Sequence, residues 1–120
     1  MKSSWRTYRG KSFFYANYSD FGEDLAAAMI EVNAVDELLS QQPEKSVAIL
    51  VDVRGTVGTP EALNFIKKSA ARTQKYIRRM AVLGIHGIRQ TLFEVVARVS
   101  GQNMVAFDDI EKAMEWLVAD

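Results

Sequence analysis

The sequence has 120 residues, of which 48% are apolar and 25% charged, so one domain with a real hydrophobic core is expected. Fifteen basic and fifteen acidic residues cancel, which argues against non-specific attraction to nucleic acid or an anionic membrane. The absence of cysteine excludes disulfides and a cysteine nucleophile, and a single histidine cannot build a multi-histidine metal site. We therefore expect no required metal or redox cofactor.

We expect neither a membrane-spanning segment nor a secretory signal from this sequence. No apolar run reaches the length of a membrane span, which predicts no integral membrane association. Met1–Gly10 lacks the apolar segment of a secretory signal. A cysteine-free chain is compatible with a reducing compartment, so a cytoplasmic location is expected.

Aromatic and β-favouring residues on both sides of a glycine turn predict an N-terminal β-hairpin. Its arms are Trp5–Tyr8 and Ser12–Tyr18, joined by Arg9-Gly10-Lys11. The first arm is polar and is expected at a sheet edge. Trp5 and Tyr8 could support self-association there, or simply pack across the hairpin.

The stretch Asp20-Phe21-Gly22-Glu23 has the spacing of a capping box and predicts the start of a helix. The helix is expected to bury apolar residues that recur at three and four positions: Leu25, Ala28, Met29, Val32, Val35 and Leu39. Its acidic residues are expected in solvent: Glu23, Asp24, Glu31 and Glu37. Gln41-Gln42-Pro43 then ends the element.

Val47–Val53 begins with five apolar residues in a row before it reaches Asp52, and this predicts a strand buried on both faces. Thr59-Pro60-Glu61 follows as a compact helix start, with a cap, a first-position proline and an acid at the positive end. The inward stripe of this helix is expected to contain four residues: Leu63, Ile66, Ala70 and Thr73.

The C-terminal third continues the alternation of strands and helices. A strand over Met80–Ile85 is entered through Arg78-Arg79, and His86-Gly87 links it to another helix. That helix presents Ile88, Leu92, Val95, Val96 and Val99, and ends at Ser100-Gly101. A strand over Asn103–Phe107 and a capping box at Asp108-Asp109-Ile110-Glu111 precede a last helix. The last helix buries Ile110, Ala113, Met114 and Leu117, with Trp116 at the boundary.

This order predicts a single α/β domain over residues 1–120. It has a largely parallel sheet with right-handed crossovers, an N-terminal β-hairpin and about four helices.

Several stretches along nearly the whole chain carry a resemblance to a known superfamily. They are Phe13-Phe14-Tyr15-Ala16-Asn17-Tyr18-Ser19, Gln42-Pro43-Glu44, Val51-Asp52-Val53-Arg54-Gly55, Ala81-Val82-Leu83-Gly84-Ile85, Phe107-Asp108-Asp109 and Glu111-Lys112-Ala113-Met114-Glu115-Trp116-Leu117. As a set they resemble the SpoIIAA-like branch of the STAS superfamily. The resemblance implies a STAS-type α/β fold and a regulatory or binding role; lipid binding, known among SEC14-like proteins, is a looser implication.

Anti-sigma-factor antagonists of that superfamily are switched by phosphorylation of a serine in an Asp-Ser-Ser-Gly-like turn at the start of the helix after the central strand. The corresponding stretch here is Thr56-Val57-Gly58-Thr59-Pro60-Glu61, which lacks that motif. Thr59 is the nearest hydroxyl by position and is the candidate phosphoacceptor.

The turn from Arg54 to Thr59 has two interpretations. Its glycines, a helix start and a guanidinium could bind an anion at the edge where open α/β sheets hold ligands. Alternatively it is a tight turn with Thr59 as the helix cap. Asp52 could act as an acid or base, but a structural pair with Arg54 is favoured. His86 could carry a proton or contact an anion, or could be a surface residue.

A basic segment follows the central strand: Lys67, Lys68, Arg72, Lys75, Arg78 and Arg79. It could contact an anionic partner, but a solvated face balanced by the acidic first helix is the usual explanation. Nucleic acid is disfavoured because Tyr76 is the only interleaved aromatic residue.

Three functions remain open. The first is a non-enzymatic binding module that takes a protein partner or a small anionic or apolar ligand. Its site would lie at the carboxyl-end edge of the sheet and comprise Arg54, Gly55, Thr56, Gly58, Thr59, His86 and Gly87. The second is a small enzyme using Asp52, Arg54 and His86. The third is a self-associating structural module, for example a homodimer.

Overall fold

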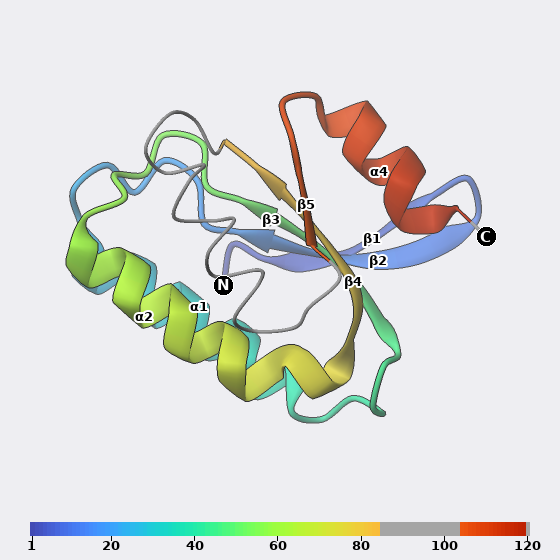
Figure 1. The fold of residues 1–120 in the computed structure, drawn as a ribbon, viewed down its shortest axis with the longest axis horizontal. Coiled ribbons are helices and arrows are strands. Elements are labelled where there is room, and N and C mark those ends of the chain that lie inside the picture. The colour runs from blue at the N-terminus through green and yellow to red at the C-terminus, as the bar shows by residue number, and fades with distance from the viewer. Residues whose placement is uncertain (85–103, 120) are drawn as a thin grey trace.

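The computed structural model describes residues 1–84 and 104–119, which form one mixed five-stranded sheet with helices on both faces (Figure 1). In chain order the elements are β1 (Ser4–Tyr8), β2 (Lys11–Asn17), α1 (Leu25–Leu39), β3 (Val47–Asp52), α2 (Pro60–Thr73), the 3-10 turn η1 (Gln74–Tyr76), β4 (Ile77–Leu83), β5 (Met104–Phe107) and α4 (Ile110–Val118). The strands lie side by side in the order β1-β2-β3-β4-β5. Only β1 and β2 are antiparallel, which confirms an α/β fold with a largely parallel sheet.

The predicted N-terminal hairpin is confirmed. Arg9 and Gly10 both have positive φ, at 51° and 77°, as a two-residue turn between right-twisted strands requires. β1 is at the edge of the sheet and is mostly exposed, as expected. The Trp5 ring packs edge-on against Phe14 across the hairpin, with 5.1 Å between centroids, although Trp5 stays 47% exposed.

The alternating sides of β3 face two separate apolar layers. Helices α1 and α2 cover one face of the sheet, and α4 covers the other (Figure 1). Ile49 packs toward α1 with Val32 and Val35, whereas Leu50 packs toward α4 with Leu117. Because every residue of β3 is buried, the prediction of a strand covered on both faces is confirmed.

Two predicted helix caps are displaced along the chain. α1 begins at Leu25, and its cap is Asp24, whose carboxylate accepts from Ala27 N at 3.1 Å. Asp20 cannot serve as the cap because its backbone, at φ 61°, donates instead to Arg54 O. At α4 the cap is Asp109 and not Asp108, since Asp109 accepts from Glu111 N at 2.8 Å.

Glu31 was expected in solvent but is only 6% exposed. Its two carboxylate oxygens accept from Lys2 N at 3.0 Å and from Ser3 N at 2.9 Å, and Ser3 Oγ donates a third bond at 2.6 Å. The expectation was wrong because the chain before β1 lies against α1, and its backbone donors need an acceptor there.

β4 begins at Ile77, three residues before the predicted strand, so Arg78 and Arg79 lie within it. Arg79 is not part of a solvated basic face: its Nη1 donates to Trp116 O at 2.6 Å, and its guanidinium carbon lies 5.2 Å from a Trp116 ring centroid. Trp116 also packs on Phe107 and covers the β5 side of the sheet, as its boundary position predicted. The predicted end of this strand at Ile85, the His86-Gly87 link, the helix with Ile88 to Val99 and its stop at Ser100-Gly101 lie outside the described residues.

Candidate functional site

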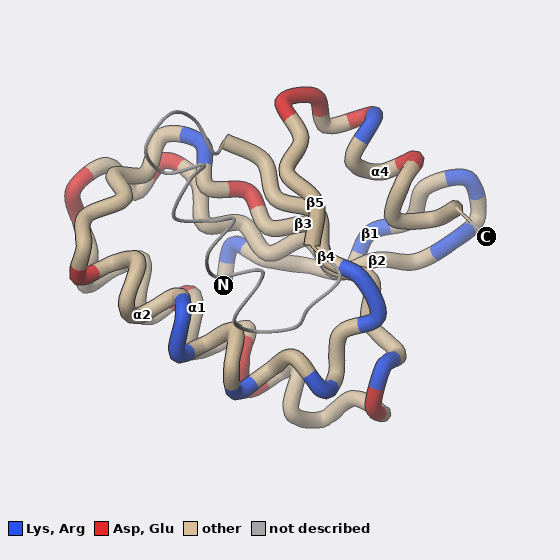
Figure 2. Tube along the Cα trace, viewed as in Figure 1, with Lys and Arg blue, Asp and Glu red and all other residues tan. Residues whose placement is uncertain are grey.

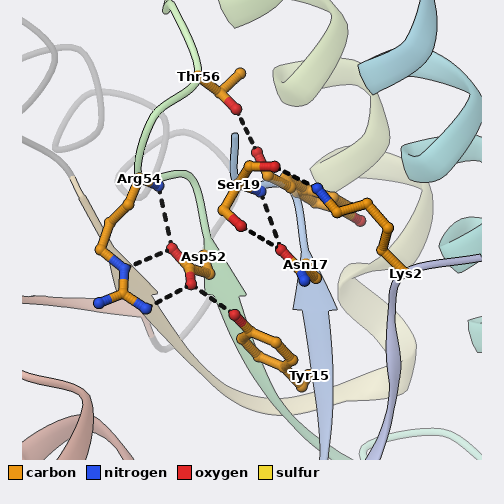
Figure 3. Close-up of polar contacts among 8 residues, drawn as sticks. Lys2, Tyr15, Asn17, Ser19, Asp52, Arg54 and Thr56 are labelled. Carbon is orange, nitrogen blue, oxygen red and sulfur yellow. Dashed lines mark hydrogen bonds and ion pairs between the residues drawn. The ribbon is translucent and has the colours of Figure 1, made fainter. Parts of the chain in front are cut away.

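The loops that leave β2 and β3 are held together at the carboxyl-end edge of the sheet. Thr56 Oγ1 donates to Tyr18 O at 2.6 Å (Figure 3). The same oxygen accepts from Phe21 N at 3.1 Å. Gly22 N donates to Gly55 O at 2.9 Å in the same contact. Thr56 therefore joins the two loops and fixes the position of the turn that follows β3.

Asp52 is the centre of a polar network at this edge. Arg54 donates to its two carboxylate oxygens from Nε at 3.0 Å and from Nη2 at 2.8 Å, and Arg54 N adds a bond of 3.1 Å (Figure 3). Tyr15 Oη donates to Oδ2 at 2.6 Å, and Arg6 lies over the Tyr15 ring. Because Asp52 is 1% exposed while the Arg54 side chain is 53% exposed, the network connects the interior to the surface.

Hydrogen bonds and burial together set the pKa values of Asp52 and Tyr15 in this network. Burial by itself raises the pKa of Asp52, but the bonds from Arg54 and Tyr15 outweigh burial and bring its pKa below the usual value. Burial and the bond to Asp52 raise the pKa of Tyr15. At neutral pH Asp52 is thus a carboxylate that receives four hydrogen bonds. The predicted structural pair with Arg54 is confirmed.

Two glycines allow the backbone to approach closely here. Gly55 has φ +74°, and a Cβ there would collide with the Asp20 side chain. Gly84, directly after β4, has φ +95°, and a Cβ there would lie 2.8 Å from Arg54 N. Sequence reasoning included Gly55 in the site but missed Gly84; the signal was a glycine at the end of a buried strand.

Thr59 caps α2, as predicted, because its Oγ1 accepts from Ala62 N at 3.1 Å. The side chain is exposed, and Gly58 before it is half-buried. His86 and Gly87, the other two residues expected at this edge, lie outside the described residues. Because His86 is not described, the expectation that it lies near Arg54 at this edge stays a prediction.

A cavity of about 150 Å³ lies between α1, α2 and the sheet. Its walls are mainly apolar: Leu25, Met29, Val51, Val53, Leu63 and Ile66 are among the lining residues. Thr56, Gly58 and Thr59 also line it, so three of the predicted site residues border this cavity. Sequence reasoning assigned Leu25, Met29, Leu63 and Ile66 to the core because a helix stripe looks the same whether it packs against side chains or lines a void.

The predicted site is thus divided between the two faces of the sheet. Asp52 follows Leu50 on the α4 side, and Arg54 binds it there. Val51 and Val53 point to the opposite side, where the cavity lies. The guanidinium and the cavity are therefore two separate features of one strand end.

The basic segment is mostly solvated, as expected. Its Lys and Arg positions follow α2 and the start of β4 along the chain (Figure 2). Arg72 pairs with Asp36 of α1 at 2.8 Å, so part of the balance by the acidic first helix is a direct contact.

Comparison of the chain with protein-family models, with curated proteins and with solved structures gives no match. Within residues 1–84 and 104–119, no helix is both long and apolar enough to cross a membrane. The same residues contain no cluster of three or more histidine or acidic side chains that could hold a metal ion.

Proposed function

We propose that this chain is a cytoplasmic, non-enzymatic binding module of the SpoIIAA-like STAS type, which holds a small and mainly apolar ligand in the cavity between α1, α2 and the sheet. The family assignment is supported by the stretches that resemble the superfamily, by the N-terminal hairpin and by the parallel pairing of β2, β3, β4 and β5. Open α/β sheets generally bind ligands beyond the carboxyl ends of their strands.

The cavity carries the proposal. A packed protein interior has few voids larger than one water molecule, whereas the cavity between α1, α2 and the sheet measures about 150 Å³. Apolar cavities of this size stay dry and take up compact apolar molecules. Thr56, Gly58 and Thr59 connect its wall to the carboxyl-end edge, where the backbone is held by loop-to-loop bonds.

A binding role fits the polar network better than catalysis. Asp52 is saturated with hydrogen bonds from Arg54 and Tyr15 and is ionised at neutral pH, so it has little capacity to exchange protons. A general base needs a pKa near the working pH. The network therefore supports a scaffold that positions the strand end.

The test uses toluene as an apolar probe of the cavity. At ten times its dissociation constant a ligand stabilises the folded state by about 1.4 kcal/mol, which raises the melting temperature by roughly 5 °C. Ala62→Leu, which fills the lining, should abolish the shift. Ala71→Leu, on the exposed side of the same helix, should retain it. No shift with the wild-type protein would refute the proposal.

A second candidate function is binding of a protein partner at the turn after β3. Val57 is 46% exposed there, and the side chain of Arg54, three residues earlier, is 53% exposed. Native mass spectrometry of gently isolated protein separates the two candidates. A retained small molecule supports the cavity, while a retained protein, or phosphate on the exposed Thr59, supports the partner site.

A further inference from the structure

The phenol of Tyr18 is an unpaired donor in an otherwise satisfied site. Tyr18 is 6% exposed, and its backbone is fully used: N donates to Asp52 O at 2.9 Å, and O accepts from Thr56 Oγ1. Its hydroxyl has no hydrogen bond to any described residue. Buried tyrosines normally find a partner for that group, so its absence needs an explanation.

The open space beside Tyr18 is the cavity. Within the described residues, Arg79 Nε is the one fully enclosed side-chain nitrogen or oxygen that lacks a partner. The Tyr18 hydroxyl is therefore not enclosed by protein atoms, even though the residue is buried. Since Tyr18 lines the cavity, we infer that its hydroxyl faces that space.

The electrostatic surroundings keep this hydroxyl protonated. Burial raises the pKa of Tyr18 well above the usual value, and the carboxylates of Asp36 and Glu31 raise it further. The phenol is thus a neutral donor. Asp36, which also lines the cavity, accepts from Ser69 at 2.7 Å and from Arg72 at 2.8 Å, so both of its oxygens already have donors.

We propose that the ligand of this cavity is a compact, neutral molecule with one hydrogen-bond acceptor, such as a ketone or ester carbonyl, that accepts from Tyr18 Oη. This inference rests on the proposed function and adds the chemical class of the ligand. An anion is excluded by two costs: an apolar wall cannot solvate it, and two carboxylates lie near the donor. A volume of about 150 Å³ limits the ligand to about ten non-hydrogen atoms.

Three probes of nearly the same shape separate the contribution of the carbonyl hydrogen bond from those of apolar contact and of negative charge. Acetophenone carries a carbonyl oxygen, α-methylstyrene replaces that oxygen with a CH₂ group, and benzoate replaces the methyl ketone with a carboxylate. Dissociation constants are measured by calorimetry for the wild-type protein and for Tyr18→Phe. A neutral hydrogen bond corresponds to roughly a threefold to tenfold change in affinity. We expect the ratio of acetophenone to α-methylstyrene affinity to fall by that factor in Tyr18→Phe, and benzoate to bind neither protein.

Tyr15→Phe is the matched control, since it removes the hydroxyl of another buried tyrosine on the opposite face of the sheet. Tyr15→Phe should lower stability, because Tyr15 Oη donates to Asp52, and should leave the affinity ratio unchanged. Tyr18→Phe should keep wild-type stability in denaturant titration, because its hydroxyl has no protein partner.

The outcomes distinguish a failure of the Tyr18 contact from a failure of the proposed ligand-binding function. An unchanged affinity ratio in Tyr18→Phe, with both neutral probes still bound, overturns the carbonyl contact and leaves the proposed function standing. Tight benzoate binding overturns the neutral class. If neither neutral probe binds the wild-type protein, the proposed function itself fails. A large loss of stability in Tyr18→Phe would mean that the hydroxyl has a structural partner, such as a fixed water molecule, and would also overturn the inference.

Discussion

Replacing Arg54 with alanine tests whether the network around Asp52 is scaffold. The substitution removes two side-chain donors, Nε at 3.0 Å and Nη2 at 2.8 Å, from a carboxylate that is 1% exposed. It leaves the bond from the backbone N–H of residue 54 and the bond from Tyr15. Asp52 would remain buried and ionised with half of its present donors.

The structure sets the size of the expected loss. Hydrogen bonds to charged groups contribute about 1.5–3 kcal/mol, and breaking a buried pair costs about 3–5 kcal/mol. Arg54 is 53% exposed, so water can replace part of what it supplies, and the remaining two donors moderate the loss. We therefore expect Arg54→Ala to lower the free energy of unfolding by about 2 kcal/mol at pH 7.

The pH dependence gives the sharper test. In the wild-type protein the folded-state pKa of Asp52 lies below its unfolded value, so its contribution is present above about pH 4 and is lost as pH falls through the folded-state pKa. In Arg54→Ala burial dominates and the pKa rises, so the variant should lose less stability on acidification. The difference between the two proteins should shrink between about pH 5 and about pH 2.

Urea titrations of both proteins across that range measure the effect. Arg78→Ala, at an exposed arginine of β4, is the control and should stay within about 0.5 kcal/mol of wild type. A loss for Arg54→Ala that is equal to the control, or that is constant with pH, would refute the assignment of Arg54 as the partner of Asp52.

Three further outcomes follow from burial and backbone geometry. Leu50→Ala should cost about 2–5 kcal/mol in denaturant titration, because Leu50 is 0% exposed, while Lys68→Ala should stay within about 0.5 kcal/mol; equal losses would contradict the core. Glu31→Gln should weaken the bonds to the N-terminal segment, speed hydrogen exchange at Ser3 N, and reduce acid sensitivity, since the pKa of Glu31 is lowered by those bonds despite burial; unchanged exchange would argue against the contact. Gly84→Ala should lower stability by about 1–3 kcal/mol, because φ +95° disfavours any side chain, and a wild-type melting temperature would show that the loop relaxes freely.

Local signals explain which elements could be predicted from the sequence. The hairpin was predictable because Arg9-Gly10 between aromatic arms specifies a two-residue turn. The central strand was predictable because Val47–Val51 is apolar without alternation. The helix start at Thr59-Pro60 was predictable because the cap, the proline and the acid lie next to one another in the chain, and the structure confirms it.

Long-range contacts explain the errors. Glu31 has the sequence context of a solvated helix residue, and only the return of Ser3 to α1 makes it a buried acceptor. Asp20 has the spacing of a cap, but its backbone N–H donates to the carbonyl of Arg54, a residue far along the chain. The cavity is a similar case, since a void between α1, α2 and the sheet depends on how far apart the layers lie.

The pleat of β3 explains how one strand end supports two different surroundings. Successive side chains alternate between the faces of a strand, so Asp52 and Val51 point in opposite directions one residue apart. The acid pairs with Arg54 and Tyr15 on the α4 side and fixes where the chain turns. The valine lines the cavity on the other side, where a charge would have been costly. Rigid polar bonds on one face can therefore hold the cavity wall in place without placing Asp52 in the cavity.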